Sequence, residues 1–88
     1  MITRDKLRIY EKYDGDTDGF ARGSKISERG ILTDQDWRFI DEILQRLRIV
    51  QSGLGSTDFG EQTRASLMEA VHDEQVRERI LQLSKPKP

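Results

Sequence analysis

The sequence predicts an all-α fold, a small bundle of three to five helices around a central helix near Thr33–Ser52. Three observations predict this fold class. Apolar residues recur with the spacing of one helix face throughout the central segment, TDQDWRFIDEILQRLRIVQS. Residues that cap or stop helices separate this segment from the other apolar segments. No segment shows the strict alternation of apolar and polar residues that is typical of a strand.

The N-terminal third begins with a predicted helix at Arg4–Tyr13, which Thr3 can cap through its hydroxyl. The composition of the next segment, DGDTDG at Asp14–Gly19, predicts a turn, which we call the acidic turn. Phe20–Ser27 is ambiguous, although its first residues are compatible with a short helical turn. The chain is then expected to pass through residues 28–32 into the central helix.

The central helix carries the strongest structural signal in the chain. Thr33 can serve as its N-cap, and acidic residues follow in the first turn, where they suit the positive end of the helix dipole. Its apolar residues, beginning with Trp37, cover roughly 160° of the circumference, which is wider than the apolar stripe of an ordinary surface helix. Gly53 can then end the helix. We therefore expect Trp37 in the core and other elements on two sides of this helix.

A further helix is predicted to start at Ser56 or Thr57, either of which can cap it. Leu54 is expected to anchor the connection that precedes this helix. The apolar positions of the helix are Phe59, Leu67, Met68 and Val71. The apolar phase changes after His72, so that either a new helix begins near Asp73 or one helix packs against different neighbours on opposite sides.

Length and composition limit the possible classes of protein. Eighty-eight residues predict a single helical domain, residues 1–83, with a disordered tail at 84–88. No apolar run suggests a signal peptide or a membrane span, so we expect a cytoplasmic location without membrane contact. The 15 Lys and Arg residues against 16 Asp and Glu residues argue against a nucleic-acid partner. The absence of cysteine excludes disulfides and thiolate metal sites.

The acidic turn resembles the first half of an EF-hand calcium loop. In such a loop, carboxylates at the first, third and fifth positions and a carbonyl at the seventh bind the ion, and a glycine at the sixth position makes the turn. Here the metal-binding positions hold Asp14, Asp16, Asp18 and Phe20. The twelfth position, which should supply a bidentate glutamate, is Lys25. The resemblance therefore implies Ca²⁺ affinity that is at best millimolar.

Two other interpretations of the acidic turn stay open. Its carboxylates can supply turn chemistry and cap a short helix at Gly19–Arg22, with Lys25 or Arg22 neutralising their charge. They can also form an exposed surface that a partner recognises.

Catalysis is not expected. His72 is the only histidine, and it lies near a helix end, where a surface or capping role is the usual one. No nucleophile, base and orienting group show a recognisable spacing, and the glycines do not form a phosphate-binding loop. We expect no enzyme activity, and no cofactor other than weakly bound calcium under the EF-hand interpretation.

The segments GDTDGFAR and LTDQDWRFIDEIL, followed by a turn with glycine, resemble short uncharacterised bacterial proteins that are all-helical. The resemblance covers about half of the chain and implies a protein-binding role like that of immunity proteins and other inhibitors. The expected partner is another protein, and the chain is expected to be a monomer or a weak homodimer. The predicted partner-binding residues are Asp14, Asp16, Asp18, Arg22, Asp41 and Arg48. The alternative function is calcium binding through a single degenerate EF-hand-like loop.

Overall fold

The computed structural model describes residues 1–85, which form six helices and contain no strand. The helices are α1 (Arg4–Lys12), α2 (Thr17–Gly23), α3 (Ile26–Ile31), α4 (Asp34–Gln51), α5 (Thr57–Ala70) and α6 (Glu74–Ser84). The all-α prediction is confirmed, but the described residues contain more helices than the predicted three to five. No helix in this range has both the length and the apolar character that a membrane crossing requires.

The additional helices, α2 and α3, are too short to show an apolar period in the sequence. α2 has seven residues and α3 has six. Each start is held by a local carboxylate. Asp16 accepts a hydrogen bond from the N–H of Gly19 at 3.0 Å, and Glu28 accepts one from the N–H of Lys25 at 2.9 Å. The acidic turn therefore ends earlier than expected, because α2 already begins at Thr17.

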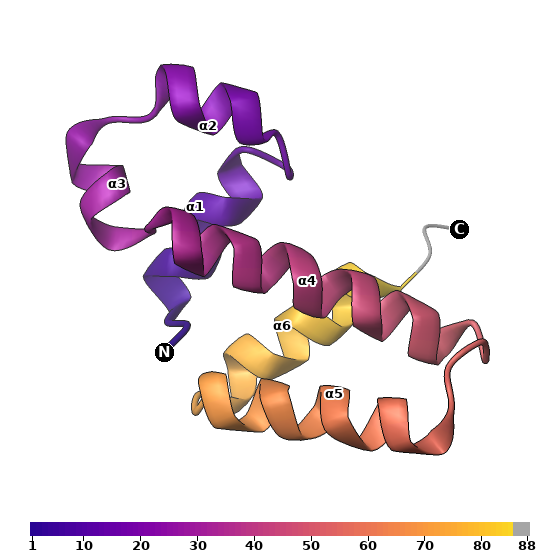
Figure 1. Ribbon diagram of the computed structural model, residues 1–88. Coiled ribbons are helices and arrows are strands. Elements are labelled where there is room, and N and C mark those ends of the chain that lie inside the picture. The colour runs from indigo at the N-terminus through magenta and orange to yellow at the C-terminus, as the bar shows by residue number, and fades with distance from the viewer. Residues whose placement is uncertain (86–88) are drawn as a thin grey trace.

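The long helix α4 crosses the molecule, and the other helices lie around its two halves (Figure 1). α1, α2 and α3 gather at its N-terminal half, whereas α5 and α6 lie along its C-terminal half (Figure 1). α4 packs against both α5 and α6, and α1 packs against α3. The expectation that the wide apolar face of the central helix serves neighbours on two sides is confirmed.

The ends of α4 lie where the sequence predicts them. Thr33 Oγ1 accepts a hydrogen bond from the N–H of Asp36, and the Asp36 carboxylate accepts one from the N–H of Thr33, both at 3.2 Å. Beyond the last helical residue, Gly53 adopts a φ of 78°, in the left-handed region that favours glycine. The predicted central helix therefore forms with both of its expected end signals.

Four aromatic side chains form the core between α1, α2 and α4. They are Tyr10, Tyr13, Phe20 and Trp37. The centroid of the Trp37 ring lies 4.7 Å from that of Tyr10 and 4.8 Å from that of Phe20. Trp37 is only 3% exposed, and its Nε1 donates a hydrogen bond to Thr17 Oγ1 at 3.1 Å. The prediction that Trp37 belongs to the core is confirmed.

Aliphatic side chains of α4, of α5 and the residue after it, and of α6 extend the core along α4. They are Ile40, Ile43, Leu44 and Leu47 of α4, Leu67 of α5, Val71 after α5, and Val76 and Ile80 of α6. α5 and α6 are separate helices, because the backbone at Val71 is extended. Asp73 caps α6 by accepting a hydrogen bond from the N–H of Gln75 at 2.9 Å. Of the two alternatives for this region, a new helix near Asp73 is confirmed.

Three residues lie differently from expectation. Leu54 is 83% exposed and does not anchor the connection between α4 and α5. Met68 is 61% exposed, because α5 turns the neighbouring Leu67 toward the core instead. Ser84, expected to begin a disordered tail, is the buried last residue of α6, and its Oγ accepts a hydrogen bond from Gln51 Nε2 at 2.6 Å. Residues 86–88 of the predicted tail lie outside the described residues.

Candidate functional site

A groove of about 540 Å³ lies where the end of α1 and the acidic turn meet α4 and α6. We call it the charged groove. Its lining residues are Tyr10, Glu11, Asp14, Gly15, Asp41, Leu44, Arg48, Arg79 and Leu83. Three of the six predicted partner-binding residues therefore meet at one place: Asp14 from the turn after α1, and Asp41 and Arg48 from α4.

The backbone places Asp14 at the rim of this groove. α1 ends at Lys12, and the N–H of Asp14 donates to the carbonyl of Glu11 at 3.0 Å. Asp14 and Gly15 then have φ values of 48° and 76°, so two consecutive left-handed residues reverse the chain. Aspartate tolerates this region better than most residues, and glycine enters it freely. The turn leaves the Asp14 side chain exposed.

Tyr10 holds Asp41 in place on the floor of the groove. The buried Tyr10 hydroxyl donates a short hydrogen bond to the Asp41 carboxylate. Burial raises the pKa of Tyr10, and the hydrogen bond to Asp41 raises this pKa further. The phenol is therefore a neutral donor at physiological pH, and it keeps Asp41 oriented.

Arg48 lies two helical turns after Asp41 on the same side of α4. Its side chain is exposed and forms no ion pair within residues 1–85. Asp14 likewise forms no ion pair in this range. Asp41 is hydrogen-bonded only by the neutral Tyr10 hydroxyl and has no ion pair in this range either. The groove therefore presents two anionic groups and one cationic group that no described side chain of opposite charge neutralises.

The other two charges of the groove are paired with each other. Arg79 of α6 donates to Glu11 of α1 through Nε at 2.9 Å and through Nη2 at 2.5 Å. This hydrogen bond and the charge of Glu11 raise the pKa of Arg79. The pair joins α1 to α6 and forms one wall of the charged groove.

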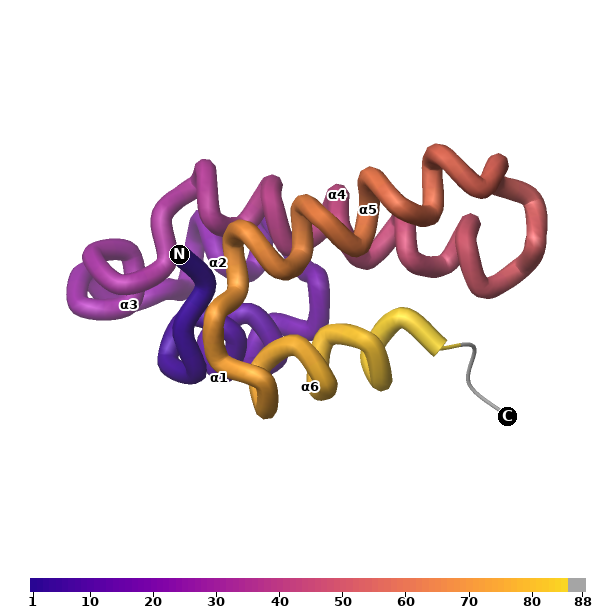
Figure 2. Tube along the Cα trace, turned by 90° about the horizontal axis from the view of Figure 1, so that it is seen from below, coloured from indigo at the N-terminus to yellow at the C-terminus, as the bar shows by residue number. Residues whose placement is uncertain are grey.

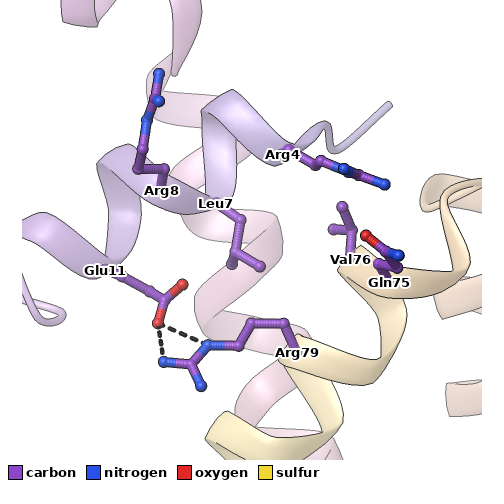
Figure 3. A pocket seen from close by; sticks show the side chains of 7 residues that line it. All are labelled: Arg4, Leu7, Arg8, Glu11, Gln75, Val76 and Arg79. Atoms are coloured by element: carbon purple, nitrogen blue, oxygen red, sulfur yellow. Dashed lines mark hydrogen bonds and ion pairs between the residues drawn. The ribbon is translucent and has the colours of Figure 1, made fainter.

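A second hollow, of about 400 Å³, lies on the other side of the Glu11–Arg79 pair, between α1 and α6 (Figure 3). Leu7 and Val76 are its apolar floor, and its other lining residues are Arg4, Arg8, Glu11, Gln75 and Arg79. Arg4 is bound to Asp73 at 2.7 Å, and Arg8 points away from Arg79 (Figure 3). Because all three of its arginines are already bound to acids, Arg8 to Asp5 at 3.0 Å, this hollow offers less unpaired charge than the charged groove.

The remaining predicted partner-binding residues lie on or beside α2 and do not line the charged groove. Asp16 is engaged as the N-cap of α2, whereas Asp18 and Arg22 are exposed on the helix itself. The acidic turn is therefore divided. Its first carboxylate, Asp14, lines the groove, whereas Asp16 caps α2 and Asp18 is exposed in the first turn of that helix.

The geometry of the acidic turn matches the capping interpretation in part. Asp16 caps the short helix, which starts two residues before the expected Gly19. A Cβ at Gly19 would lie 2.5 Å from Asp16 Oδ2, so the glycine makes room for the capping carboxylate. The expected neutralisation by Lys25 or Arg22 is not formed within residues 1–85.

The calcium interpretation meets competing hydrogen bonds at two of its four positions. The Asp16 carboxylate accepts from Gly19, and the Phe20 carbonyl accepts from the N–H of Ser24 at 3.2 Å. Within residues 1–85, no three side chains of His, Asp or Glu are grouped so that they could hold a metal ion. Calcium binding through Asp14, Asp16 and Asp18 would therefore require the start of α2 to rearrange.

A buried ionic network around Glu28 gave no signal in the sequence. Glu28 is 9% exposed, and its carboxylate accepts hydrogen bonds from Lys12 Nζ at 2.8 Å, Tyr13 Oη at 2.7 Å and the N–H of Lys25 at 2.9 Å. The hydrogen bonds from Lys12, Lys25 and Tyr13 lower the pKa of Glu28 to about 2. The network joins the end of α1 to the start of α3, and the donors come from two different segments.

His72 lies in the exposed connection between α5 and α6. Its Nε2 donates to the carbonyl of Glu69 at 3.1 Å, which is a local contact at the end of α5. This position suits the capping role expected from the sequence.

Comparison of the chain with protein-family models, with curated proteins and with solved structures found no match. Its own site geometry therefore carries the functional argument.

Proposed function

We propose that this protein is a small protein-binding module whose partner contacts the charged groove. One observation carries the proposal: the fold brings Asp14, from the turn after α1, beside Asp41 and Arg48 of α4 around one groove. Asp14 and Arg48 have no ion-pair partner in residues 1–85, so a second protein can supply the opposite charges.

The chemistry of the groove suits a protein surface. It combines groups of both signs with the apolar side chains of Leu44 and Leu83, as the contact surfaces between proteins do. Tyr10 adds an aromatic ring whose hydroxyl is already satisfied by Asp41. The near-balance of 15 basic and 16 acidic residues gives little general attraction to nucleic acid, which supports a protein as the partner.

The role that we propose for this module is inhibition of its partner in the cytoplasm, in the manner of an immunity protein. The resemblance to short all-helical bacterial proteins supports this role by analogy. We do not propose calcium binding at the acidic turn, because the Asp16 carboxylate and the Phe20 carbonyl already accept hydrogen bonds within the fold.

The experiment compares the capture of a partner by the wild-type chain and by two variants. Arg48→Glu reverses the charge of the unpaired cation in the groove. We expect this change to weaken binding of the captured partner at least tenfold, about 1.4 kcal/mol, in a binding titration. Arg38→Glu is the matched control, because Arg38 is also an exposed arginine of α4 but does not line the groove. The proposal would be overturned if both variants bound the partner as tightly as the wild type, or if both lost the same amount of affinity.

A further inference from the structure

A third hollow, of about 430 Å³, lies between α5 and α6. Both helices run along the side of the molecule that is turned toward the viewer in Figure 2. We call the hollow the α5–α6 groove. Its lining residues are Arg64, Leu67 and Met68 of α5 and Glu74, Arg77, Glu78 and Leu81 of α6. These positions follow the i, i+3, i+4 and i+7 spacing of one face of each helix, so the groove has two regular walls.

The groove exposes two apolar side chains, one from each helix. Leu67 is buried at its base, whereas Met68 is 61% exposed and Leu81 is 37% exposed. A single exposed apolar residue is ordinary, but these two line the same hollow. Methionine is flexible and polarisable, and it is used often at surfaces where proteins contact each other.

The rim of the groove is balanced in charge. Arg64 and Arg77 carry two positive charges, and the two glutamates that complete the rim, Glu74 and Glu78, carry two negative ones. None of the four forms an ion pair within residues 1–85. Arg77 is held by a hydrogen bond from its Nη1 to the carbonyl of Val71 at 2.7 Å.

Self-complementary charge is what a twofold contact requires. In such a contact the same patch occurs on both subunits, so that residue i of one chain meets residue j of the other and the reverse also holds. A patch of one sign would repel its own copy. The α5–α6 groove has both signs on its rim and an apolar centre, so it can face an identical groove without leaving like charges opposite each other.

We propose that a second copy of this chain docks on the α5–α6 groove. The two grooves face each other across a twofold axis, Met68 of each chain enters the groove of the other, and Arg64 of each chain opposes Glu78 of the other. We expect a weak dimer, with a dissociation constant on the order of micromolar or higher. It leaves the charged groove free, since none of the lining residues is shared. The proposal is therefore independent of the proposed partner.

Sedimentation velocity of the full chain, from about 10 μM to about 1 mM, tests the dimer. The expected result is a sedimentation coefficient that rises with concentration toward that of a dimer. Met68→Asp should weaken the self-association at least tenfold, because it places a charge at the apolar centre. Leu54→Asp is the matched control. Leu54 is exposed and lies outside the groove, so this variant should associate like the wild type.

Charge reversal tests the orientation of the two copies. Arg64→Glu and Glu78→Arg should each weaken the dimer about tenfold, and the chain that carries both changes should recover it, because the opposed charges are restored. Both side chains are exposed, so circular dichroism should show an unchanged helical content.

Three results would overturn the proposal. If the wild-type chain stayed monomeric up to about 1 mM, the groove would not be a contact between two copies of the chain, and a different protein would be its occupant. A Met68→Asp dimer as strong as that of the wild type would place the contact elsewhere. Failure of the double charge reversal to recover association would contradict the twofold arrangement.

Discussion

Trp37 holds the N-terminal half of the molecule together at the scale of a single residue. Its ring contacts those of Tyr10, Tyr13 and Phe20, and its Nε1 is bound to Thr17. Tyr10 continues this contact to the charged groove, because its ring packs on Trp37 while its hydroxyl holds Asp41. The aromatic cluster therefore stabilises the core and, through Tyr10, orients Asp41 in the candidate site.

Trp37→Ala is expected to lower the free energy of unfolding by about 3–5 kcal/mol, because it removes a large buried ring and leaves a cavity. Urea unfolding followed by circular dichroism measures this loss. Trp37→Phe keeps an aromatic ring and should lose less. Should the alanine variant not fold, the fluorescence of the native wild type provides a second measure. Native emission at the wavelength of a fully solvated indole would contradict the prediction.

At the scale of the element, five of the six helices in residues 1–85 are capped by the side chain of the residue that precedes them. Side chains of Thr3, Asp16, Thr33, Ser56 and Asp73 accept hydrogen bonds from the first turns of their helices. These contacts satisfy backbone N–H groups that have no partner within the helix. They are most important for α2, which has only seven residues and cannot form by periodic packing alone.

Thr33→Ala is expected to destabilise the protein by about 1 kcal/mol, within the range of roughly 0.5–2 kcal/mol for lost N-caps. The reason is that α4 loses both the hydrogen bond to the N–H of Asp36 and the hydroxyl contact with its carboxylate. Thermal or urea unfolding measures the change. Thr57→Ala is the control, because Thr57 is exposed and follows the actual cap of α5, Ser56. Equal losses in the two variants would contradict the capping role of Thr33.

At the scale of the whole molecule, ionic contacts add to the apolar core in joining separate elements. Glu28 ties α3 to the end of α1, and Arg79 of α6 binds Glu11 of α1. Arg4 at the start of α1 binds Asp73, which precedes α6. Ion pairs therefore connect both ends of α1 to α6 or to its N-cap residue. The charged groove depends on this arrangement, because α1 and α6 supply four of its lining residues.

The stability of the whole protein is expected to fall in acid partly through Glu28. Its pKa in the folded protein is lowered from an ordinary 4.5 to about 2, so the charged carboxylate stabilises the fold above pH 4.5. This contribution decreases as the pH falls from 4.5 to about 2, because the unfolded state then binds more protons. Urea midpoints across this range, for the wild type and Glu28→Gln, measure the effect.

The two chains should differ most at neutral pH, where the wild type is the more stable, and should converge toward pH 2. Asp18→Asn provides the control, since Asp18 is exposed and makes no ion pair within residues 1–85. A wild-type advantage over Glu28→Gln that stays constant with pH would contradict the assignment.

The candidate site was predictable only in part. Asp14 belongs to a conspicuous acidic turn, and Asp41 and Arg48 lie on the polar side of a recognisable helix, so these residues could be selected from the sequence. Glu11 and Arg79 could not, because they are 68 positions apart and only the packing of α1 near α6 brings them together. Asp16, Asp18 and Arg22 looked equivalent to Asp14, but the early start of α2 carries them away from the groove.

The sequence by itself determined the all-α class, the central helix and the ends of the longer helices. These features depend on local physics, namely the apolar period of a helix and the capping of its N–H groups by neighbouring side chains. Only the tertiary structure decided that Met68 and Leu54 are exposed and that Glu28 is buried. It also decided which charges share a groove. These features depend on which face of each helix its neighbours cover, and contacts between distant segments leave no periodic signal along the chain.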